Sequence, residues 1–259
     1  MDKSLWKQIE RIAIEAGKKT LPFRRSDMSS IEKYDGSPVT DADLASNKHI
    51  LTELAKLCSI PILSEEDISD IDLLSGYCFV VDPLDGTKSF ISGRDDFCVN
   101  IGLLKDGEPV AGLIYAPVLE DLYSCFDGQV YINSKPVEFK KRVAPYKGAR
   151  SFNHPKAEEL AFAKFNDVDS FISQGAALKF ASMICGEVDL YVRFAPCSEW
   201  DTAAGHALLK AYGGDIMDLT TRATLKYGKP SYLNGPFVAY IDGMCIKFPE
   251  NLEKLLTKN

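Results

Sequence analysis

Four short β-prone runs follow one another between residues 77 and 126 of this 259-residue chain: YCFVVD, VNIGLLKDG, PVAGLIYAP and DLYSCF. Glycine, proline and aspartate turn residues separate them. The last three runs are joined by connections of only a few residues, which are too short for parallel crossovers and favour antiparallel pairing. We therefore predict a meandering antiparallel sheet in this part of the chain, with a further short strand at residues 62–63.

Helical patterns flank this predicted sheet. Apolar residues recur at helical spacing from Leu5 to Ala16, which predicts an amphipathic helix over about residues 3–20. Thr40 is suited to cap a second helix that runs to about Cys58, and we expect the polar stretch 24–37 to form a loop or a hairpin. Beyond residue 151, helical patterns at 155–163, 177–185 and 201–211 alternate with the strand-like DLYVRF, DIMDL and FVAYI. This alternation indicates a layered α/β protein.

Composition excludes several classes of protein. The longest apolar runs are much shorter than the ~20 residues of a membrane-spanning helix, and the charged start MDKSLWKQIE does not resemble a signal peptide, so we expect a cytoplasmic protein. The seven cysteines form no CxxC pair, which argues against a disulfide framework or a zinc site. A net charge of −7 argues against a nucleic-acid polymer as partner, although cations bound to an acidic site would allow a small phosphate to bind.

The segment FVVDPLDGTKSF carries the clearest chemical signal. An apolar strand ends at Asp82, and a turn that contains proline brings Asp85 beside it. Gly86 permits close approach of the backbone, and Thr87 begins a predicted short helix whose free N–H groups suit a phosphate. The segment therefore predicts two metal-binding carboxylates and an anion cradle. The alternative is that both aspartates only cap a turn, as DP and DG pairs commonly do.

Three further acidic residues lie on separate segments: Asp43 in SPVTDAD, Glu65 in ILSEED and Asp201 in SEWDTAAGH. Each also has a simpler interpretation. Asp43 and Asp201 can be carboxylates in the first turn of a helix, and Glu65 with Glu66 can be a solvated acidic run.

Together these segments resemble the inositol monophosphatase superfamily and, within it, the CysQ-type 3′(2′),5′-bisphosphate nucleotidases. The segments DGSPVTDAD, PILSEE, VDPLDGTKSFI, VNIGLL, GLIYAPV, GAALKF, LYVRFAP and EWDTAAGHAL follow the order of the family and cover nearly the whole chain. The resemblance implies the αβαβα sandwich of the inositol monophosphatase and fructose-1,6-bisphosphatase type. It implies a single catalytic unit over residues 1–259, with an α+β half at about 1–148 and an α/β half at about 149–259.

The resemblance also implies two to three Mg²⁺ ions. The implied ligands of the first are the side chains of Glu65 and Asp82 and the carbonyl oxygen of Leu84. Those of the second are Asp82, Asp85 and Asp201. A histidine-free set of oxygen ligands suits hard Mg²⁺ better than zinc, and two ions roughly 4 Å apart can stabilise both the attacking and the leaving oxygen of a phosphate ester.

A third, weaker ion is implied near Asp43 and Glu65, and Asp43 with Thr87 is implied to orient the attacking water. On this interpretation His49 and His206 are not metal ligands. The substrate phosphate is expected at Gly86 and Thr87.

The non-transferred part of the substrate is expected at Ser151, Lys179 and Arg193, with Arg150 as a further candidate cation. Each of these cations could instead be a surface charge. The chain departs from the family in two places. It has Ala176 and Ala177 where two serines are common, and His154 is displaced by two residues in ARSFNH. These changes affect the expected substrate pocket and leave the implied metal ligands intact.

The leading hypothesis is hydrolysis of 3′-phosphoadenosine 5′-phosphate to AMP and phosphate, with inhibition by lithium. An inositol-1-monophosphatase or related sugar phosphatase is the alternative, and a non-catalytic protein that binds a phospholigand is a third. The expected partner is a small phosphorylated metabolite. We expect a monomer or homodimer, and the basic runs at Lys18–Lys19 and 140–142 leave open a weak peripheral contact with anionic lipid at the inner membrane.

Overall fold

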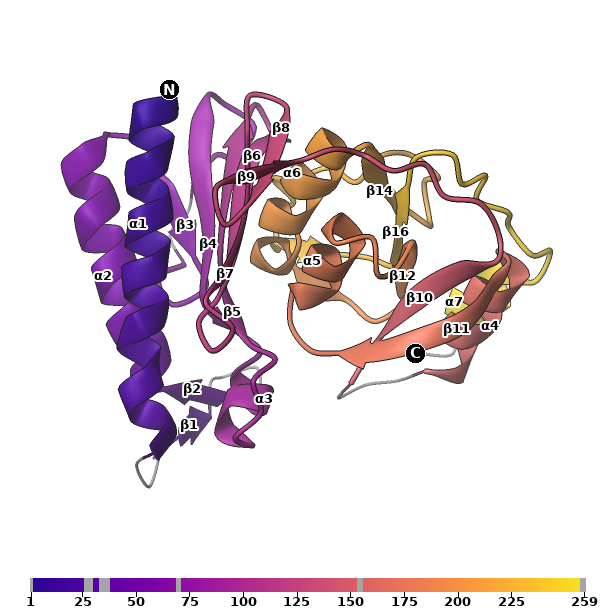
Figure 1. The fold of residues 1–259 in the computed structure, drawn as a ribbon, viewed down its shortest axis with the longest axis horizontal. Coiled ribbons are helices and arrows are strands. Elements are labelled where there is room, and N and C mark those ends of the chain that lie inside the picture. The colour runs from indigo at the N-terminus through magenta and orange to yellow at the C-terminus, as the bar shows by residue number, and fades with distance from the viewer. Residues whose placement is uncertain (1, 26–29, 33–37, 69–70, 153–155, 257–259) are drawn as a thin grey trace.

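The computed structural model describes residues 2–25, 30–32, 38–68, 71–152 and 156–256. Within them the chain forms five layers (Figure 1): a pair of helices, a seven-stranded sheet, a second pair of helices, a five-stranded sheet and an outer pair of short helices. This arrangement confirms the predicted αβαβα sandwich. The division into halves near residue 148 stays a prediction, because the second pair of helices packs against both sheets.

The first layer consists of α1 (Lys3–Thr20) and α2 (Asp41–Leu57), both predicted from the sequence. Thr40 caps α2 as expected, and Asp43 completes a capping box with it. Between the two helices lie η1 (Leu21–Arg25) and a hairpin in which β1 (Ser30–Glu32) pairs antiparallel with β2 (Pro38–Thr40). Of the two predicted alternatives for this polar stretch, the hairpin is therefore the one observed.

The seven-stranded sheet has the order β3-β4-β5-β6-β7-β8-β9. From β4 onward each strand pairs antiparallel with the next, which confirms the predicted meander, whereas β3 pairs parallel with β4. The strands are β3 (Ile62–Ser64), β4 (Tyr77–Asp85), β5 (Cys98–Lys105), β6 (Glu108–Ala116), β7 (Asp121–Phe126), β8 (Gln129–Ile132) and β9 (Lys135–Val137).

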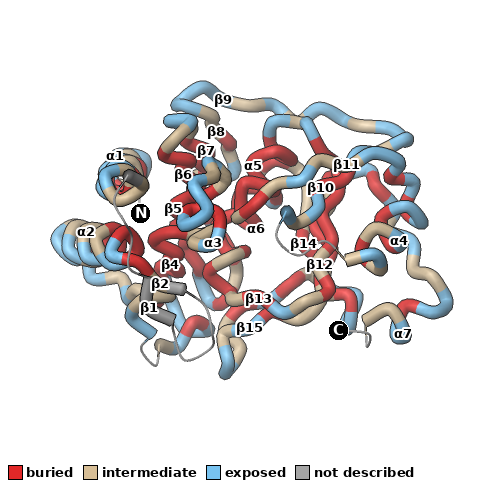
Figure 2. Tube along the Cα trace, turned by 90° about the horizontal axis from the view of Figure 1, so that it is seen from below, coloured by how far each residue is buried: buried red, intermediate tan, exposed pale blue. Residues whose placement is uncertain are grey.

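Both faces of this sheet are covered, so its strands are apolar on both sides. In β4, Phe79 and Val81 face the first pair of helices, and Cys78 and Val80 face the second pair. That second pair is α5 (Leu178–Ile184) and α6 (Ala203–Tyr212). Buried residues are concentrated in these helices and in the strands beside them (Figure 2). The main core therefore lies between the two sheets.

The five-stranded sheet has the order β11-β10-β12-β16-β14 and is mixed. β10 pairs parallel with β11 and β12, and β16 pairs antiparallel with β12 and β14. The strands are β10 (Tyr146–Ser151), β11 (Val168–Gln174), β12 (Leu190–Arg193), β14 (Gly214–Asp218) and β16 (Phe237–Ile241). Its outer face carries α4 (Ala157–Phe165) and α7 (Leu252–Leu256).

β13 (Cys197–Ser198) precedes α6 and pairs antiparallel with β15 (Leu233–Asn234), which follows it in the chain. The predicted helix at 201–211 begins two residues late, at Ala203, because residues 199–201 form the separate 3₁₀ turn η2 (Glu199–Asp201). None of the helices in the described ranges is long and apolar enough to cross a membrane. The predictions of a cytoplasmic location, of a monomer or homodimer and of a weak lipid contact stay predictions.

Candidate active site

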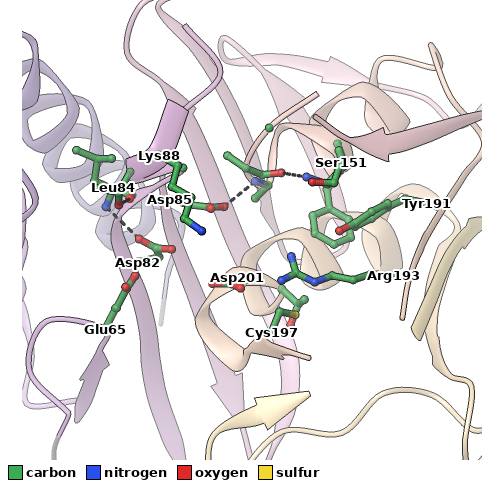
Figure 3. A pocket seen from close by; sticks show the side chains of 18 of the residues that line it. Glu65, Asp82, Leu84, Asp85, Lys88, Ser151, Tyr191, Arg193, Cys197 and Asp201 are labelled. Carbon is green, nitrogen blue, oxygen red and sulfur yellow. Dashed lines mark hydrogen bonds between the residues drawn. The ribbon is translucent and has the colours of Figure 1, made fainter. Parts of the chain in front are cut away.

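One pocket of about 240 Å³ lies where the end of β4 meets α5, η2 and β12 (Figure 3). The predicted site residues line it, except Asp43 and the further candidate Arg150. The lining residues are Glu65, Asp82, Leu84, Asp85, Gly86, Thr87, Lys88, Ser151, Gly175, Ala176, Ala177, Lys179, Phe180, Tyr191, Arg193, Cys197, Asp201, Thr202 and Phe237.

An irregularity in β4 brings Asp82 and Asp85 to the same face of the sheet. Strict alternation would point Asp82 toward the pocket and Asp85 toward the opposite face. The register of β4 against β5 shifts between these two residues, so that Asp82 lies opposite Asn100 and Asp85 opposite Cys98. Asn100 and Cys98 are two residues apart on β5 and share a face. The extra residue in β4 therefore acts as a β-bulge that turns both carboxylates into the pocket.

The turn after Asp85 is tight. Gly86 has a φ of +94°, and a Cβ there would lie 3.0 Å from the carbonyl oxygen of Asp96, so glycine suits this position. The predicted short helix follows as α3 (Thr87–Ile91). The Thr87 hydroxyl lies 3.1 Å from Asp43 Oδ1 and 3.2 Å from the carbonyl oxygen of Leu84. Thr87 therefore links the end of β4 to the start of α2.

Asp43 lies behind Thr87 and is buried. Its Oδ2 accepts hydrogen bonds from the backbone N–H and the hydroxyl of Thr40, the latter at 2.5 Å. Burial raises the pKa of Asp43, and the hydrogen bonds from Thr40 partly offset this effect. Asp43 therefore lies in the first turn of α2, as its simpler interpretation predicts, and the same carboxylate also contacts Thr87. Its role in orienting water stays a prediction.

Glu65 and Asp201 reach the pocket from two other segments. Glu65 follows β3, and its backbone N–H donates to the carbonyl oxygen of Val81, which fixes it beside β4. Asp201 lies in η2, where its carboxylate accepts a hydrogen bond of 3.2 Å from the backbone N–H of Ser198. In Figure 3, Glu65, Asp82, Asp85 and Asp201 surround one side of the pocket. We call these four residues the acid cluster.

The acid cluster brings like charges close together, and nearby cations only partly offset their repulsion. Burial raises the pKa of Asp82 well above its ordinary value, and the charges of Glu65, Asp85 and Asp201 raise it further. Burial also raises the pKa of Asp85, against the opposing charge of Lys179, and it raises the pKa of Asp201 to about 7. Like charges buried together repel one another, and a bound cation would remove that repulsion.

The donors of the acid cluster fit a hard divalent cation. They are carboxylate oxygens on a polar wall, together with the backbone oxygen of Leu84, and Mg²⁺ prefers such ligands and retains several waters. Within the part of the chain that the structure describes, no three acidic, histidine or cysteine side chains converge tightly enough to hold a single ion by themselves. The four carboxylates reach the same part of the pocket from three segments of the chain. This arrangement suits ions that share the carboxylates and complete their coordination with water and phosphate oxygens.

The opposite wall of the pocket is cationic. Lys179 is only 4% exposed, and its ammonium group donates 2.6 Å to the carbonyl oxygen of Ala176. Burial lowers the pKa of Lys179 to about 8, although the charge of Asp85 opposes that shift. Arg193 extends from the end of β12 into the pocket and donates to the carbonyl oxygens of Ala195 and Pro196.

Two candidate residues do not belong to this wall. Arg150 is exposed and does not line the pocket, and its guanidinium donates to the hydroxyl of Ser173, which agrees with the surface-charge alternative. The alternation of β10 explains this outcome, because Arg150 and Ser151 point to opposite faces of the strand and only Ser151 lines the pocket. The predicted displacement of His154 falls outside the described residues.

Sequence reasoning missed several lining residues and one supporting residue. Lys88, Tyr191, Cys197 and Phe237 line the pocket from four separate elements, and local pattern marks none of them. Asn100 did carry a signal, because it is a polar residue in the otherwise apolar run VNIGLL. It is fully buried, and its amide donates 3.0 Å to Asp85 Oδ2.

Comparisons with known proteins agree with this geometry. Residues 5–252 match the model of the inositol monophosphatase family. The chain is 36% identical over 219 residues to the 3′(2′),5′-bisphosphate nucleotidase CysQ of Shigella flexneri, and 38% identical over 217 residues to that of Salmonella typhimurium (strain LT2). Each alignment covers 81% of this chain and 88% of the relative.

Solved structures are similar over almost the full length. CysQ from Bacteroides thetaiotaomicron, a bacterial member of the inositol monophosphatase family, matches with a TM-score of 0.78 at 30% identity, covering 92% of this chain and 97% of that one. The extragenic suppressor protein suhB from Bartonella henselae matches with a TM-score of 0.79 at 26% identity, covering 99% of this chain and 100% of that one.

Proposed function

Because the chain belongs to the inositol monophosphatase family, we propose that it is a Mg²⁺-dependent phosphomonoesterase that hydrolyses 3′-phosphoadenosine 5′-phosphate to AMP and phosphate. The observation that carries this proposal is the division of the pocket into an acidic wall and a cationic wall. A substrate with two phosphates needs both, since metal ions on the acidic wall bind only the ester that is cleaved and the second phosphate needs cations of its own.

The two walls would bind different groups. Glu65, Asp82, Asp85 and Asp201, with the carbonyl oxygen of Leu84, would hold two to three Mg²⁺ ions. Such ions polarise the phosphate and lower the pKa of a bound water. Lys179 and Arg193, with the hydroxyl of Ser151, would bind the second phosphate and the sugar.

Thr87 and Asp43 are suited to orient the attacking water. The Thr87 hydroxyl is held between two acceptors, Asp43 Oδ1 and the carbonyl oxygen of Leu84, so its oxygen lone pairs remain directed toward the pocket. Buried Asp43 is fixed by Thr40 and keeps Thr87 in a single position. The backbone N–H groups after Gly86 are suited to contact the phosphate that is cleaved.

Phosphate release from a substrate panel tests this function. With Mg²⁺ present, we expect a higher kcat/KM for 3′-phosphoadenosine 5′-phosphate than for inositol 1-phosphate or a sugar monophosphate, and loss of activity in EDTA. The alternative of an inositol or sugar phosphatase stays open, because Ala176 and Ala177 line the pocket and offer no hydroxyl groups to either a nucleoside or a sugar. A higher kcat/KM on a monophosphate would therefore identify that alternative as the correct one.

Substitution of Lys179 tests the cationic wall. Lys179→Met keeps the length of the side chain and removes its charge. We expect KM for the bisphosphate to rise by about 10- to 100-fold, the value of one charge-assisted hydrogen bond, with a smaller change for an aryl monophosphate. Lys147→Met, an exposed position on β10, is the matched control. Equal effects on the two substrates would argue against a second-phosphate site.

Lithium offers a further test of the metal sites. We expect millimolar Li⁺ to inhibit the enzyme by occupying a Mg²⁺ position, and the inhibition to change with the Mg²⁺ concentration. Full activity in millimolar Li⁺ at low Mg²⁺ would contradict this expectation.

A further inference from the structure

The loop after α3, residues 92–97, lies between η1 and the turn that precedes α5. On one side, Arg24 of η1 holds it by donating to the carbonyl oxygens of Gly93 and Arg94 and to the carboxylate of Asp95 at 2.6 Å. On the other side, Asp96 Oδ2 accepts a 2.8 Å hydrogen bond from the backbone N–H of Gly175. The loop therefore links the helical layer near the N-terminus to the turn that precedes α5.

Asp96 is held in place as an ionised carboxylate. Arg94 donates to it twice, from Nε to Oδ1 at 2.8 Å and from Nη2 to Oδ2 at 3.0 Å. Burial favours a raised pKa for Asp96, but the hydrogen bonds and charge of Arg94 prevail and lower it. Such a two-point pair fixes orientation as well as charge, so the carboxylate presents one defined acceptor to Gly175.

The contact with the turn is a close fit. A Cβ at Gly175 would lie 2.6 Å from Asp96 Oδ2, and one at Gly86 would lie 3.0 Å from the carbonyl oxygen of Asp96 and 3.2 Å from the Cβ of Ala176. Three segments of the pocket wall therefore meet almost backbone to backbone at Asp96. They are the turn after Asp85, the loop itself and the turn at residues 175–177.

The turn at residues 175–177 has a backbone conformation that contacts with neighbouring segments must stabilise. Ala176 has a φ of +52°, which is uncommon for a residue with a Cβ and is seen where the surroundings determine the backbone. The turn directs two groups into the acidic and cationic walls. The backbone N–H of Ala177 donates 2.6 Å to Asp85 Oδ2, and the carbonyl oxygen of Ala176 accepts from Lys179.

Arg94 also contacts the segment that follows β10. Its guanidinium carbon lies 3.4 Å from the centre of the Phe152 ring, a cation–π contact. Phe152 follows the pocket residue Ser151, and its backbone N–H donates to the carbonyl oxygen of Gln174. The pair formed by Arg94 and Asp96 therefore contacts the residues that follow two adjacent strands. Arg94 contacts Phe152 after β10, and Asp96 contacts Gly175 after β11.

We propose that Asp96, fixed by Arg94, is a positioning residue that sets the distance between Asp85 on the acidic wall and Lys179 on the cationic wall through the turn at residues 175–177. The proposal rests on the proposed function, since the two walls bind the two phosphates of one substrate only when they stand the right distance apart. Asp96 touches neither the reacting atoms nor the substrate, and it acts through Gly175.

The test compares Asp96→Ala with Asp95→Ala. The neighbouring Asp95 belongs to the same loop, but among the residues that the structure describes its side chain bonds to Arg24 on the helical side and not to Gly175, so it is a matched control. In hydrogen exchange measured by mass spectrometry or NMR, we expect the amides of Gly175 and Ala177 to exchange at least about tenfold faster in Asp96→Ala than in wild type. In Asp95→Ala their exchange should be unchanged.

Kinetics provide the second readout. We expect Asp96→Ala to raise KM for the bisphosphate about tenfold, more than KM for an aryl monophosphate, whereas Asp95→Ala leaves both within about twofold. Asp96→Asn, which keeps the shape and one acceptor oxygen, should fall between wild type and Asp96→Ala, and it serves in place of Asp96→Ala if that variant does not fold.

The two readouts separate this proposal from the proposed function. If the Asp96 variants change exchange at residues 175–177 and bisphosphate KM no more than Asp95→Ala does, the positioning role is wrong. A change in thermal stability alone, without these two, also overturns it. If wild type releases no phosphate from any ester, the proposed function fails, and exchange at Gly175 and Ala177 alone decides whether Asp96 holds the turn.

Discussion

Two buried polar clusters lie on either side of the start of α6, and they differ in how their charges are balanced. The acid cluster, formed by Glu65, Asp82, Asp85 and Asp201, brings like charges together. Burial raises the pKa values of Asp82, Asp85 and Asp201, and neighbouring carboxylates raise those of Asp82 and Asp201 further. The other, which we call the histidine cluster, consists of Thr202, His206, Asp215, Thr224 and Tyr227.

The histidine cluster is satisfied internally. His206 Nε2 lies 2.7 Å from Asp215 Oδ1, and its Nδ1 lies 3.1 Å from the hydroxyl of Tyr227. Asp215 Oδ2 accepts a further hydrogen bond of 2.6 Å from Thr224. Burial favours a raised pKa for Asp215, but its bonds with His206 and Thr224 lower it, whereas burial lowers the pKa of His206 and favours the neutral ring.

The contrast distinguishes a structural site from a functional one. Buried polar groups that serve structure are paired, because an unpaired group costs stability. A cluster of buried carboxylates that raise one another's pKa costs stability and is expected where a cation or a reaction requires it. The predicted exclusion of His206 as a metal ligand agrees with this view, since both of its ring nitrogens already have partners.

Removing one charge from the acid cluster should have the largest effect. We expect Asp82→Asn to lower kcat/KM by about 10³-fold or more, because it removes a proposed ligand of both metal ions. In EDTA the same variant should be at least as stable as wild type, since buried repulsion is relieved. Steady-state kinetics and thermal unfolding measure the two effects, with Asp169→Asn, an exposed aspartate on β11, as control. Turnover within tenfold of wild type would contradict the assignment of Asp82 as a metal ligand, and only the absence of turnover in wild type itself would favour the non-catalytic alternative.

Mg²⁺ should stabilise the protein more at high pH than at low pH. Asp201 has a pKa of about 7 in the folded chain and an ordinary value of 3.8, so the folded state holds a proton that the unfolded state has lost. Without metal, the contribution of Asp201 to stability therefore falls as the pH rises through this window.

Saturation with Mg²⁺ at about 100 times its Kd should add about 2.7 kcal/mol at pH 8 and less at pH 5.5, where protons compete for the ligands. Thermal unfolding in EDTA and in Mg²⁺ at both pH values measures this difference. An equal stabilisation by Mg²⁺ at both pH values, or a larger one at pH 5.5, would contradict the expected repulsion among the carboxylates of the acid cluster.

A substitution in the histidine cluster should lower stability and leave activity nearly unchanged. We expect Asp215→Asn to lower the free energy of unfolding by about 1–3 kcal/mol, because it weakens the bonds to His206 and Thr224. Its kcat/KM should stay within about threefold of wild type at temperatures well below Tm. Denaturant unfolding and steady-state kinetics test this, again against Asp169→Asn. A large loss of activity without loss of stability would mean that this cluster takes part in the reaction.

A charge outside both clusters should have the smallest effect. Arg150 is exposed and bonds to Ser173 on the neighbouring strand. We expect Arg150→Ala to change stability by no more than about 0.5 kcal/mol and kcat/KM by no more than about twofold. A rise in KM comparable to that of Lys179→Met would show that Arg150 reaches the substrate after all.

Much of the fold could be predicted because its signals are local. The spacing from Leu5 to Ala16 predicted α1, and Thr40 marked the start of α2. Turn residues divided the meander from Tyr77 onward. Where the prediction was inexact, a tertiary contact decided the outcome, as when residues 199–201 formed a turn of their own before α6.

The sequence by itself placed Asp82 and Asp85 near one another, because only two residues separate them, whereas the bulge that turns both into the pocket depends on the pairing of β4 with β5. The sequence also marked Glu65 and Asp201 as acidic candidates, and resemblance to a family gave them roles as metal ligands. Only the tertiary structure decided that Asp43 lies behind Thr87, that Lys179 is buried while Arg150 is exposed, and that Asp96 holds Gly175. Those relations depend on how two sheets and the helices between them pack, and a local pattern carries no information about partners tens of residues away in the chain.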